Sequence, residues 1–131
     1  MANRISIEQM TYPNDHRGYV IEPVGLDAIP YQKNVHMALT EPGHIRGNHY
    51  HLRGHEIAVV MGPALFRYRE EPDGAVQDLN IAPGEAYRLR IPPGVAHAFQ
   101  NPGQVPMMII AFNTEVHDPA NPDVVRDVLI D

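Results

Sequence analysis

Three histidines and a glutamate crowd into the stretch "RGNHYHLRGHE", which runs from Arg46 to Glu56. The whole chain holds only eight histidines, so this concentration asks for a cause. Imidazoles and carboxylates bind divalent transition metals, and they also carry protons in general acid–base catalysis. The stretch therefore indicates a metal site, an acid–base site or a solvated surface. Which of the three applies depends on the strands that carry these residues and on the direction in which their side chains point.

The local pattern favours a metal site. Side chains two apart on a strand share a face, so His49 and His51 are predicted to lie side by side. The turn-like "LRG" follows, and Glu56 then opens the run "EIAVVM", whose inner face returns the carboxylate toward the pair. A fourth candidate, His97, stands in the strand expected after the turn "PPG". Three imidazoles and one carboxylate suit zinc best, with iron, manganese or nickel as alternatives.

Plainer interpretations apply to each of these residues when it is taken singly. A histidine pair on a surface strand is common, and a lone glutamate is most often a surface charge. His44 and His55 are expected to be solvated or to lie beside the ligands. The chain has no cysteine, so a thiolate site and a disulfide framework are both excluded.

Short β-type runs recur between glycines and prolines, and no long stretch has helical periodicity. This spacing predicts an all-β fold, a small antiparallel β-barrel over residues 1–131 as a single domain. The expected strands are 4–7, 18–22, 34–40, 46–51, 56–61, 64–70, 75–80, 85–91, 95–101 and 107–113. The run 107–113, "MMIIAFN", is apolar throughout and indicates a covered strand at a homodimer contact. The tail 114–131 is expected to hold a short helix or a strand.

Composition narrows the class of protein. The net charge is −6 and the basic residues are scattered, so nucleic acid is disfavoured as a partner. No run approaches the roughly 18 apolar residues of a membrane span, and the N-terminus shows no apolar signal core. We therefore expect a cytoplasmic protein whose partner is a small molecule.

The histidine and glutamate positions also fit a known signature. Gly43, His49, His51, Glu56 and Gly62 follow the first cupin motif, G-x5-H-x-H-x(3,4)-E-x6-G, with one residue fewer before the last glycine. The stretch from Gly84 to Asn101 follows the second motif, G-x5-P-x-G-x2-H-x3-N, with seven residues rather than five before the proline. Both departures change strand or turn lengths and leave the ligand positions intact. The chain thus resembles the cupin superfamily over its core motifs, 43–62 and 84–101.

This resemblance implies a barrel whose mouth binds a metal through His49, His51, Glu56 and His97. Gly94 and Asn101 would be turn or structural residues. A narrower resemblance, carried by "RGNHYH" and "AFNTEVHDPANPD", is to the C-terminal cupin domain of capsular-polysaccharide enzymes that epimerise a UDP-linked 4-keto-6-deoxy sugar. The chain is also similar to sugar-nucleotide 3,4-ketoisomerases, which carry R-G-x-H-A-H and work without metal. These 131 residues hold no reductase domain, unlike the first group, and they have Glu56 and His97 in ligand places, unlike the second.

The implied reaction is epimerisation or isomerisation of a nucleotide-linked keto sugar, which needs a proton taken from the carbon beside a ketone and returned. Candidates for the base are Lys33, His36, His44, His55 and Tyr87. Candidates for binding a diphosphate are Lys33, Arg46, Arg88 and Arg90. Two other classes stay open at this point: an iron-dependent dioxygenase, and a sugar-binding or other small-ligand cupin without catalysis.

Overall fold

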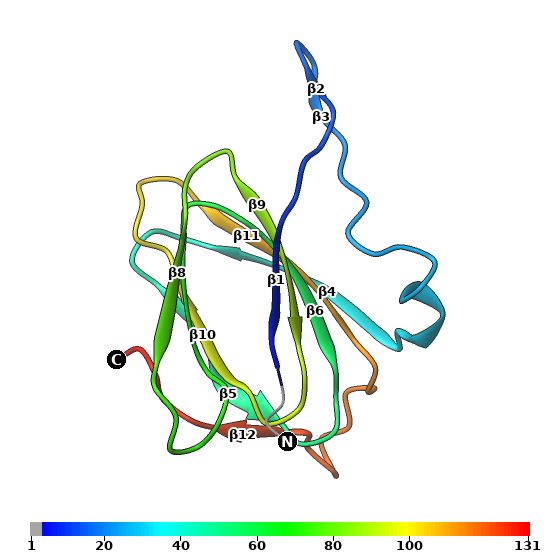
Figure 1. The fold of residues 1–131 in the computed structure, drawn as a ribbon, viewed down its shortest axis with the longest axis vertical. Helices are drawn as coiled ribbons and strands as arrows, with labels where there is room; N and C mark the ends of the chain where they lie inside the picture. Colours follow the sequence, from blue (N-terminus) through cyan, green and yellow to red (C-terminus); the bar gives the residue numbers. More distant parts are fainter. Residues whose placement is uncertain (1–3) are drawn as a thin grey trace.

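Two facing antiparallel sheets form the body of the protein in a computed structural model, which describes residues 4–131 (Figure 1). The first sheet has the order β1-β9-β6-β11-β4, with bounds Ser6–Gln9, Ala86–Ile91, Glu56–Met61, Met107–Asn113 and Asn34–Thr40. The second has the order β12-β5-β10-β7-β8, with bounds Val124–Arg126, Ile45–His51, Ala96–Gln100, Ala64–Arg69 and Gln77–Ile81. The predicted all-β antiparallel fold is confirmed.

Alternation along the strands sends one set of side chains into the space between the sheets. On β7 Ala64, Phe66 and Tyr68 are buried, while the residues between them are half-buried. These side chains join Leu89 of β9 and Phe99 of β10 in one apolar cluster. Such a cluster supplies the main stabilisation of the fold, because each Å² of apolar surface removed from water stabilises the folded state by roughly 25 cal/mol.

Two additions lie outside this body. Strands β2 (Asn14–Asp15) and β3 (Gly18–Tyr19) form a hairpin that projects from one end (Figure 1). The segment that follows includes the 3-10 helix η1 (Ile29–Tyr31) and covers part of the outer face of the first sheet. There Val24 and Ala28 pack on Ile57, with Phe112 beside them, as a second small cluster.

The observed strands follow the predicted ones closely in the middle of the chain. The runs 34–40, 56–61 and 107–113 have the predicted bounds, whereas the run 18–22 pairs only as far as Tyr19. The tail 114–131 contains the short strand β12, so the strand alternative is correct among the described residues. Residues 1–3 of the predicted domain lie outside the described part of the chain. No helix in residues 4–131 is long and apolar enough to cross a membrane.

The C-terminal tail is tied to β5 by Asn48. Its side-chain oxygen accepts hydrogen bonds from the backbone N–H groups of Leu129 and Ile130 at 2.8 and 3.0 Å, and its side-chain nitrogen donates to the Ile130 carbonyl at 2.9 Å. Strand β12 pairs with the end of β5, with Val124 opposite His51 and Arg126 opposite His49. The tail is thereby held across the end of the barrel where the histidines lie.

Candidate metal and substrate site

A bulge in β5 aims its two histidines into the barrel. Gly47 and Asn48 both have positive φ, 88° and 60°, and the pairing with β10 shifts at this point, so that His97 lies opposite His49 while Ala98 lies opposite Gly47. A β-bulge inserts an extra residue and redirects the side chains that follow. A Cβ on Gly47 would lie 2.9 Å from the His97 carbonyl oxygen, so the close approach of the two strands requires glycine.

The three predicted imidazoles converge. His49 and His51 of β5 and His97 of β10 each offer a ring nitrogen, and these nitrogens lie within 4.8 Å of one another. The ring centroids of His49 and His97 are 4.8 Å apart and those of His49 and His51 are 5.2 Å apart. His51 and His97 are buried and His49 is half-buried, so this cluster is inside the barrel rather than on a wet surface.

Glu56 completes the cluster as the first residue of β6. Its two carboxylate oxygens divide between two histidines, with Oε1 3.5 Å from His51 Nε2 and Oε2 3.5 Å from His97 Nε2. Glu56 is buried, while its neighbour His55 is exposed. The strand register predicted for "EIAVVM" is therefore correct.

Two nitrogens in this cluster lack hydrogen-bond partners. His51 Nε2 and His97 Nε2 are buried and make no hydrogen bond. Buried polar atoms are nearly always satisfied, and an exception calls for an explanation such as an ion. Both nitrogens face the carboxylate that a cation would share with them. The residues present thus fit a divalent metal.

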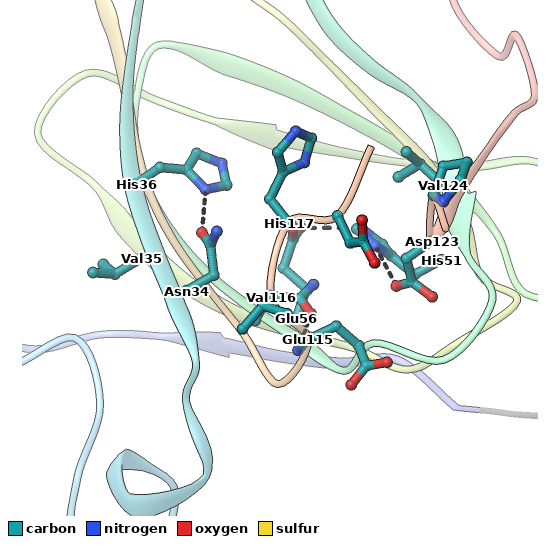
Figure 2. A pocket seen from close by; sticks show the side chains of 13 residues that line it. Asn34, Val35, His36, His51, Glu56, Glu115, Val116, His117, Asp123 and Val124 are labelled. Atoms are coloured by element: carbon teal, nitrogen blue, oxygen red, sulfur yellow. Dashed lines mark hydrogen bonds and ion pairs between the residues drawn. The ribbon is translucent and has the colours of Figure 1, made fainter. Parts of the chain in front are cut away.

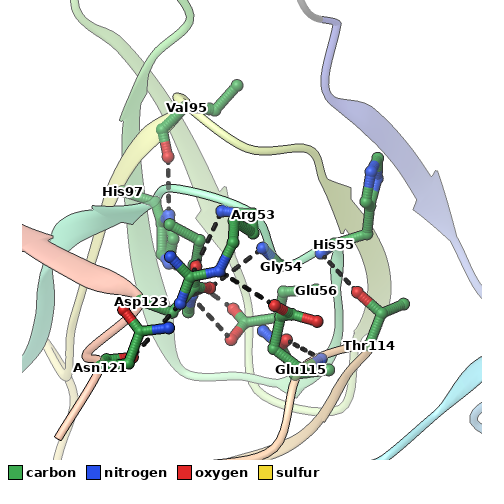
Figure 3. A network of polar contacts seen from close by, with 12 residues as sticks. Arg53, Gly54, His55, Glu56, Val95, His97, Thr114, Glu115, Asn121 and Asp123 are labelled. Atoms are coloured by element: carbon green, nitrogen blue, oxygen red, sulfur yellow. Dashed lines mark hydrogen bonds and ion pairs between the residues drawn. The ribbon is translucent and has the colours of Figure 1, made fainter.

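The opposite ring nitrogens are held by fixed acceptors (Figure 3). His97 Nδ1 donates to the Val95 carbonyl at 2.9 Å, which leaves the lone pair on Nε2. His51 Nδ1 lies 3.3 Å from Asp123 Oδ2. Asp123 in turn accepts the backbone N–H groups of Arg53 at 2.7 Å and Gly54 at 3.0 Å. This arrangement presents the metal-facing nitrogens in the correct tautomer, as partners of metal-binding histidines do.

The electrostatics of the cluster keep most of its members ready to bind a cation. Burial, together with the charges of His97 and His51, lowers the pKa of His49 to about 4. Burial likewise lowers the pKa of His97. For Glu56 burial raises the pKa, but the contact with His51 and the charges of the three histidines outweigh it and lower the pKa to about 2. For His51 burial is outweighed by Glu56 and Asp123, so its pKa is raised. Metal ligands must be deprotonated, and at neutral pH His49, His97 and Glu56 are.

A cavity of about 460 Å³ opens from this cluster to the surface (Figure 2). Its inner end is formed by His51 and Glu56, and its walls come from the start of β4, the end of β11 and the tail. The lining includes Val35, Val116, Pro122 and Val124 as apolar residues and Asn34, His36, Asn113, Glu115, His117, Asp118 and Asp123 as polar ones. This is the space in which a ligand could meet the cluster.

Among the predicted base candidates, only His36 lines this cavity. His55 borders a separate cavity that shares Glu56 in its wall. His44 is exposed in the turn before β5, the Lys33 side chain is exposed, and Tyr87 Oη bonds to Gln9 at 3.4 Å on the side of β1. The structure therefore brings one of the five candidates to the cavity beside the histidine cluster.

The predicted diphosphate-binding arginines lie elsewhere. Arg46 donates to Thr40 Oγ1 at 3.0 Å, and Arg88 binds the Glu22 and Pro23 carbonyls and Glu8. Arg90 lies 3.6 Å from Asp27. None of the three lines the cavity beside the histidines. Their guanidinium groups hold the N-terminal segments and the β4–β5 connection in place.

Sequence reasoning missed Asp123 and His117. Asp123 lies 72 residues after its partner His51, and His117 stands in the loop between β11 and β12. Neither belongs to a cupin motif. The only signal was the stretch "AFNTEVHDPANPD", which contributed to the narrower resemblance without assigning a role to either residue.

Residues 13–125 match the family described as "Polysaccharide biosynthesis C-terminal domain". The chain belongs to this family. It is 32% identical over 83 residues to a UDP-2-acetamido-2,6-beta-L-arabino-hexul-4-ose reductase of Pseudomonas aeruginosa, a match that covers 63% of this chain and 22% of that protein. The chain thus spans about a fifth of that relative.

Two further matches cover nearly the whole chain. The spore coat polysaccharide biosynthesis protein SpsL of Bacillus subtilis is 27% identical over 136 residues, which covers 94% of this chain and 87% of SpsL. The structure of QdtA, a sugar 3,4-ketoisomerase from Thermoanaerobacterium thermosaccharolyticum in complex with TDP, superposes with a TM-score of 0.74 over 97% of this chain and 90% of QdtA. Its sequence is 19% identical, so this likeness concerns the fold.

Proposed function

We propose that the protein is a metal-dependent epimerase or isomerase that acts on a nucleotide-linked keto sugar during synthesis of a polysaccharide precursor. The observation that carries the proposal is the pair of unsatisfied buried nitrogens, His51 Nε2 and His97 Nε2, facing Glu56 at the inner end of an open cavity. The family and the printed activities of its relatives support the substrate class.

The metal would be held by His49, His51, Glu56 and His97. Nitrogen and oxygen donors without sulfur favour zinc, and iron, manganese or nickel also accept this set. A divalent ion bound there supplies Lewis acidity to a carbonyl oxygen that enters the cavity. Asp123 and the Val95 carbonyl hold two of the imidazoles in the orientation that such binding requires.

The charges around the cavity restrict which part of the substrate enters. Glu115, Asp118 and Asp123 line it together with Glu56, and no lysine or arginine is among the described lining residues. Arg53 lies nearby, but its guanidinium already pairs with Glu115 at 3.1 Å and lies 3.6 Å from Asp123. A diphosphate would meet like charge here, so the uncharged sugar enters and the diphosphate stays outside.

Proton exchange tests this function. We expect the zinc-loaded protein to exchange solvent deuterium into the carbon beside the ketone of a UDP- or dTDP-linked 4-keto-6-deoxy sugar, followed by NMR. Chelator-treated protein should exchange far more slowly and recover when zinc is returned. His44→Asn, a change in the exposed turn before β5, is the matched control and should exchange like the wild type. Absence of exchange by the zinc-loaded protein with both nucleotides would contradict the proposal.

Two further measurements, of ligand binding and of oxygen consumption, separate the two alternative classes. A ligand-binding cupin would bind one of these nucleotide sugars, by calorimetry, without exchange. An iron-dependent dioxygenase would consume oxygen only when loaded with iron(II). The proposed enzyme, in contrast, exchanges the substrate's proton with solvent when zinc is bound and does so in the absence of oxygen.

A further inference from the structure

The register of three neighbouring strands, β6, β11 and β4, places His36 on the same inner face as Glu56. On β6, β11 and β4 the register places Glu56, Asn113 and Asn34 in one row and Ala58, Ala111 and His36 in the next. Ala58 and Ala111 are buried in the apolar cluster, whereas Asn34, His36, Glu56 and Asn113 line the cavity.

His36 is oriented by its neighbour on the same face. Its Nδ1 lies 3.3 Å from Asn34 Oδ1, a carbonyl oxygen that can only accept a hydrogen bond. Nδ1 therefore carries the proton in the neutral ring, and the lone pair is on Nε2. Figure 2 shows His36 on the side of the cavity opposite His51. An imidazole in this tautomer can accept a proton at Nε2.

A second histidine reaches the same cavity from a different element. His117 belongs to the loop between β11 and β12, and in Figure 2 its ring stands between His36 and His51. The loop starts with a turn tied to the end of β11, where Glu115 N–H donates to Asn113 Oδ1 at 2.8 Å, and it contains a second turn in which Ala120 N–H donates to Asp118 Oδ1 at 3.0 Å. The cavity thus carries one imidazole on the sheet and one on the covering loop.

We propose that His36 and His117 are the two proton-transferring catalytic residues, acting on opposite faces of the sugar carbon beside the ketone. This assignment rests on the proposed function. In one direction His36 Nε2 takes the proton, the C–H bond breaks, and its electron pair moves onto the carbonyl oxygen as an enolate. Protonated His117 then delivers a proton to the opposite face, the new C–H bond forms, and the ketone returns. Solvent restores both protonation states, and no oxidant or reductant is consumed.

The test follows solvent deuterium exchange separately from each of the two epimers of the 4-keto sugar nucleotide, with zinc-loaded wild type, His36→Asn and His117→Asn. A base that faces one side of the carbon removes the proton from one epimer only. Each variant should therefore lose exchange from one epimer by about 100- to 10,000-fold and keep exchange from the other, with the two variants affecting opposite epimers. Net epimerisation should fall in both.

Two controls keep the outcomes distinct. Zinc content per chain should equal that of the wild type in both variants, and loss of zinc from either would show a ligand rather than a proton carrier and overturn the assignment. Exchange of both epimers at the wild-type rate by both variants would overturn the assignment and leave the proposed function standing. No exchange by the wild type itself would overturn the function and the assignment together.

Discussion

The two ends of the barrel interior are built from the same strands and differ in what those strands carry. At one end β6, β11 and β10 contribute Val60, Ile109 and Phe99 to the apolar cluster. At the other end β6 contributes Glu56 and β10 contributes His97, both buried. The apolar end can hold the fold by itself, which lets the polar end keep unsatisfied nitrogens and like charges that would destabilise an isolated site.

The largest effect on folding should come from the apolar end. Phe66 is fully buried and its ring lies 4.9 Å from that of Phe99, so Phe66→Ala leaves a cavity and should cost about 3–5 kcal/mol of the free energy of unfolding. Urea denaturation measures this loss. Zinc bound per folded chain should stay at the wild-type value, and a parallel loss of zinc from the folded protein would mean that the two ends are not separable.

A smaller effect, confined to the polar end, should follow from Asp123→Asn. The substitution keeps an oxygen for only one of the two N–H groups, Arg53 at Oδ1 or Gly54 at Oδ2, and it removes the charge beside His51. We expect zinc affinity to fall by about 10- to 100-fold, the range for partners of metal-binding histidines. Competition with a chelator measures it. An unchanged zinc affinity would show that Asp123 only holds the C-terminal tail against the turn at Arg53 and Gly54.

The pH dependence of the metal-free protein should also originate at the polar end. The pKa of His49 is lowered to about 4 and that of His97 is lowered too, so the stability they contribute is present above the unfolded pKa of about 6.5 and lost as the pH falls toward 4. The raised pKa of His51 acts in the opposite direction, since its contribution is present below 6.5 and lost as the pH rises.

Because His49 and His97 together outweigh His51, the metal-free protein should have a lower free energy of unfolding at pH 5 than at pH 7.5. Urea unfolding measures this difference. His49→Gln removes one of the two groups and should make the difference between the two pH values smaller. A difference of the same size in both proteins would place its origin outside the histidine cluster.

The smallest effect on stability should come from the outer face of β4, where Met37 and Leu39 are exposed. Strand β11, which the sequence indicated for the homodimer contact, lies inside the sheet between β6 and β4. We predict that the edge strand β4 forms the contact instead, because an apolar face beside an unpaired edge favours association. Met37→Glu should convert a dimer to a monomer in light scattering, with the stability of the protomer changed by less than about 0.5 kcal/mol. A wild-type monomer at high concentration would refute the prediction.

The core strands and the histidine cluster could be predicted because both depend on short-range patterns. Alternation located β7 and β9, and the spacing of His49, His51 and Glu56 placed them on one inner face. The partners Asp123 and His117 could not be found this way, since they come from a loop and a tail whose path depends on the bulge at Gly47 and on the Asn48 contacts. The arginines look available in sequence but are engaged by backbone carbonyls and carboxylates in the fold.

The most direct test of the account is elemental analysis of the purified protein after incubation with zinc and removal of the excess. We predict tightly bound zinc in stoichiometric amount in the wild type and in His44→Asn, and loss of that zinc in His49→Gln and in Glu56→Gln, with circular dichroism showing that both remain folded. Wild-type protein without zinc, or equal zinc in all four proteins, would contradict the assignment of the metal to this cluster.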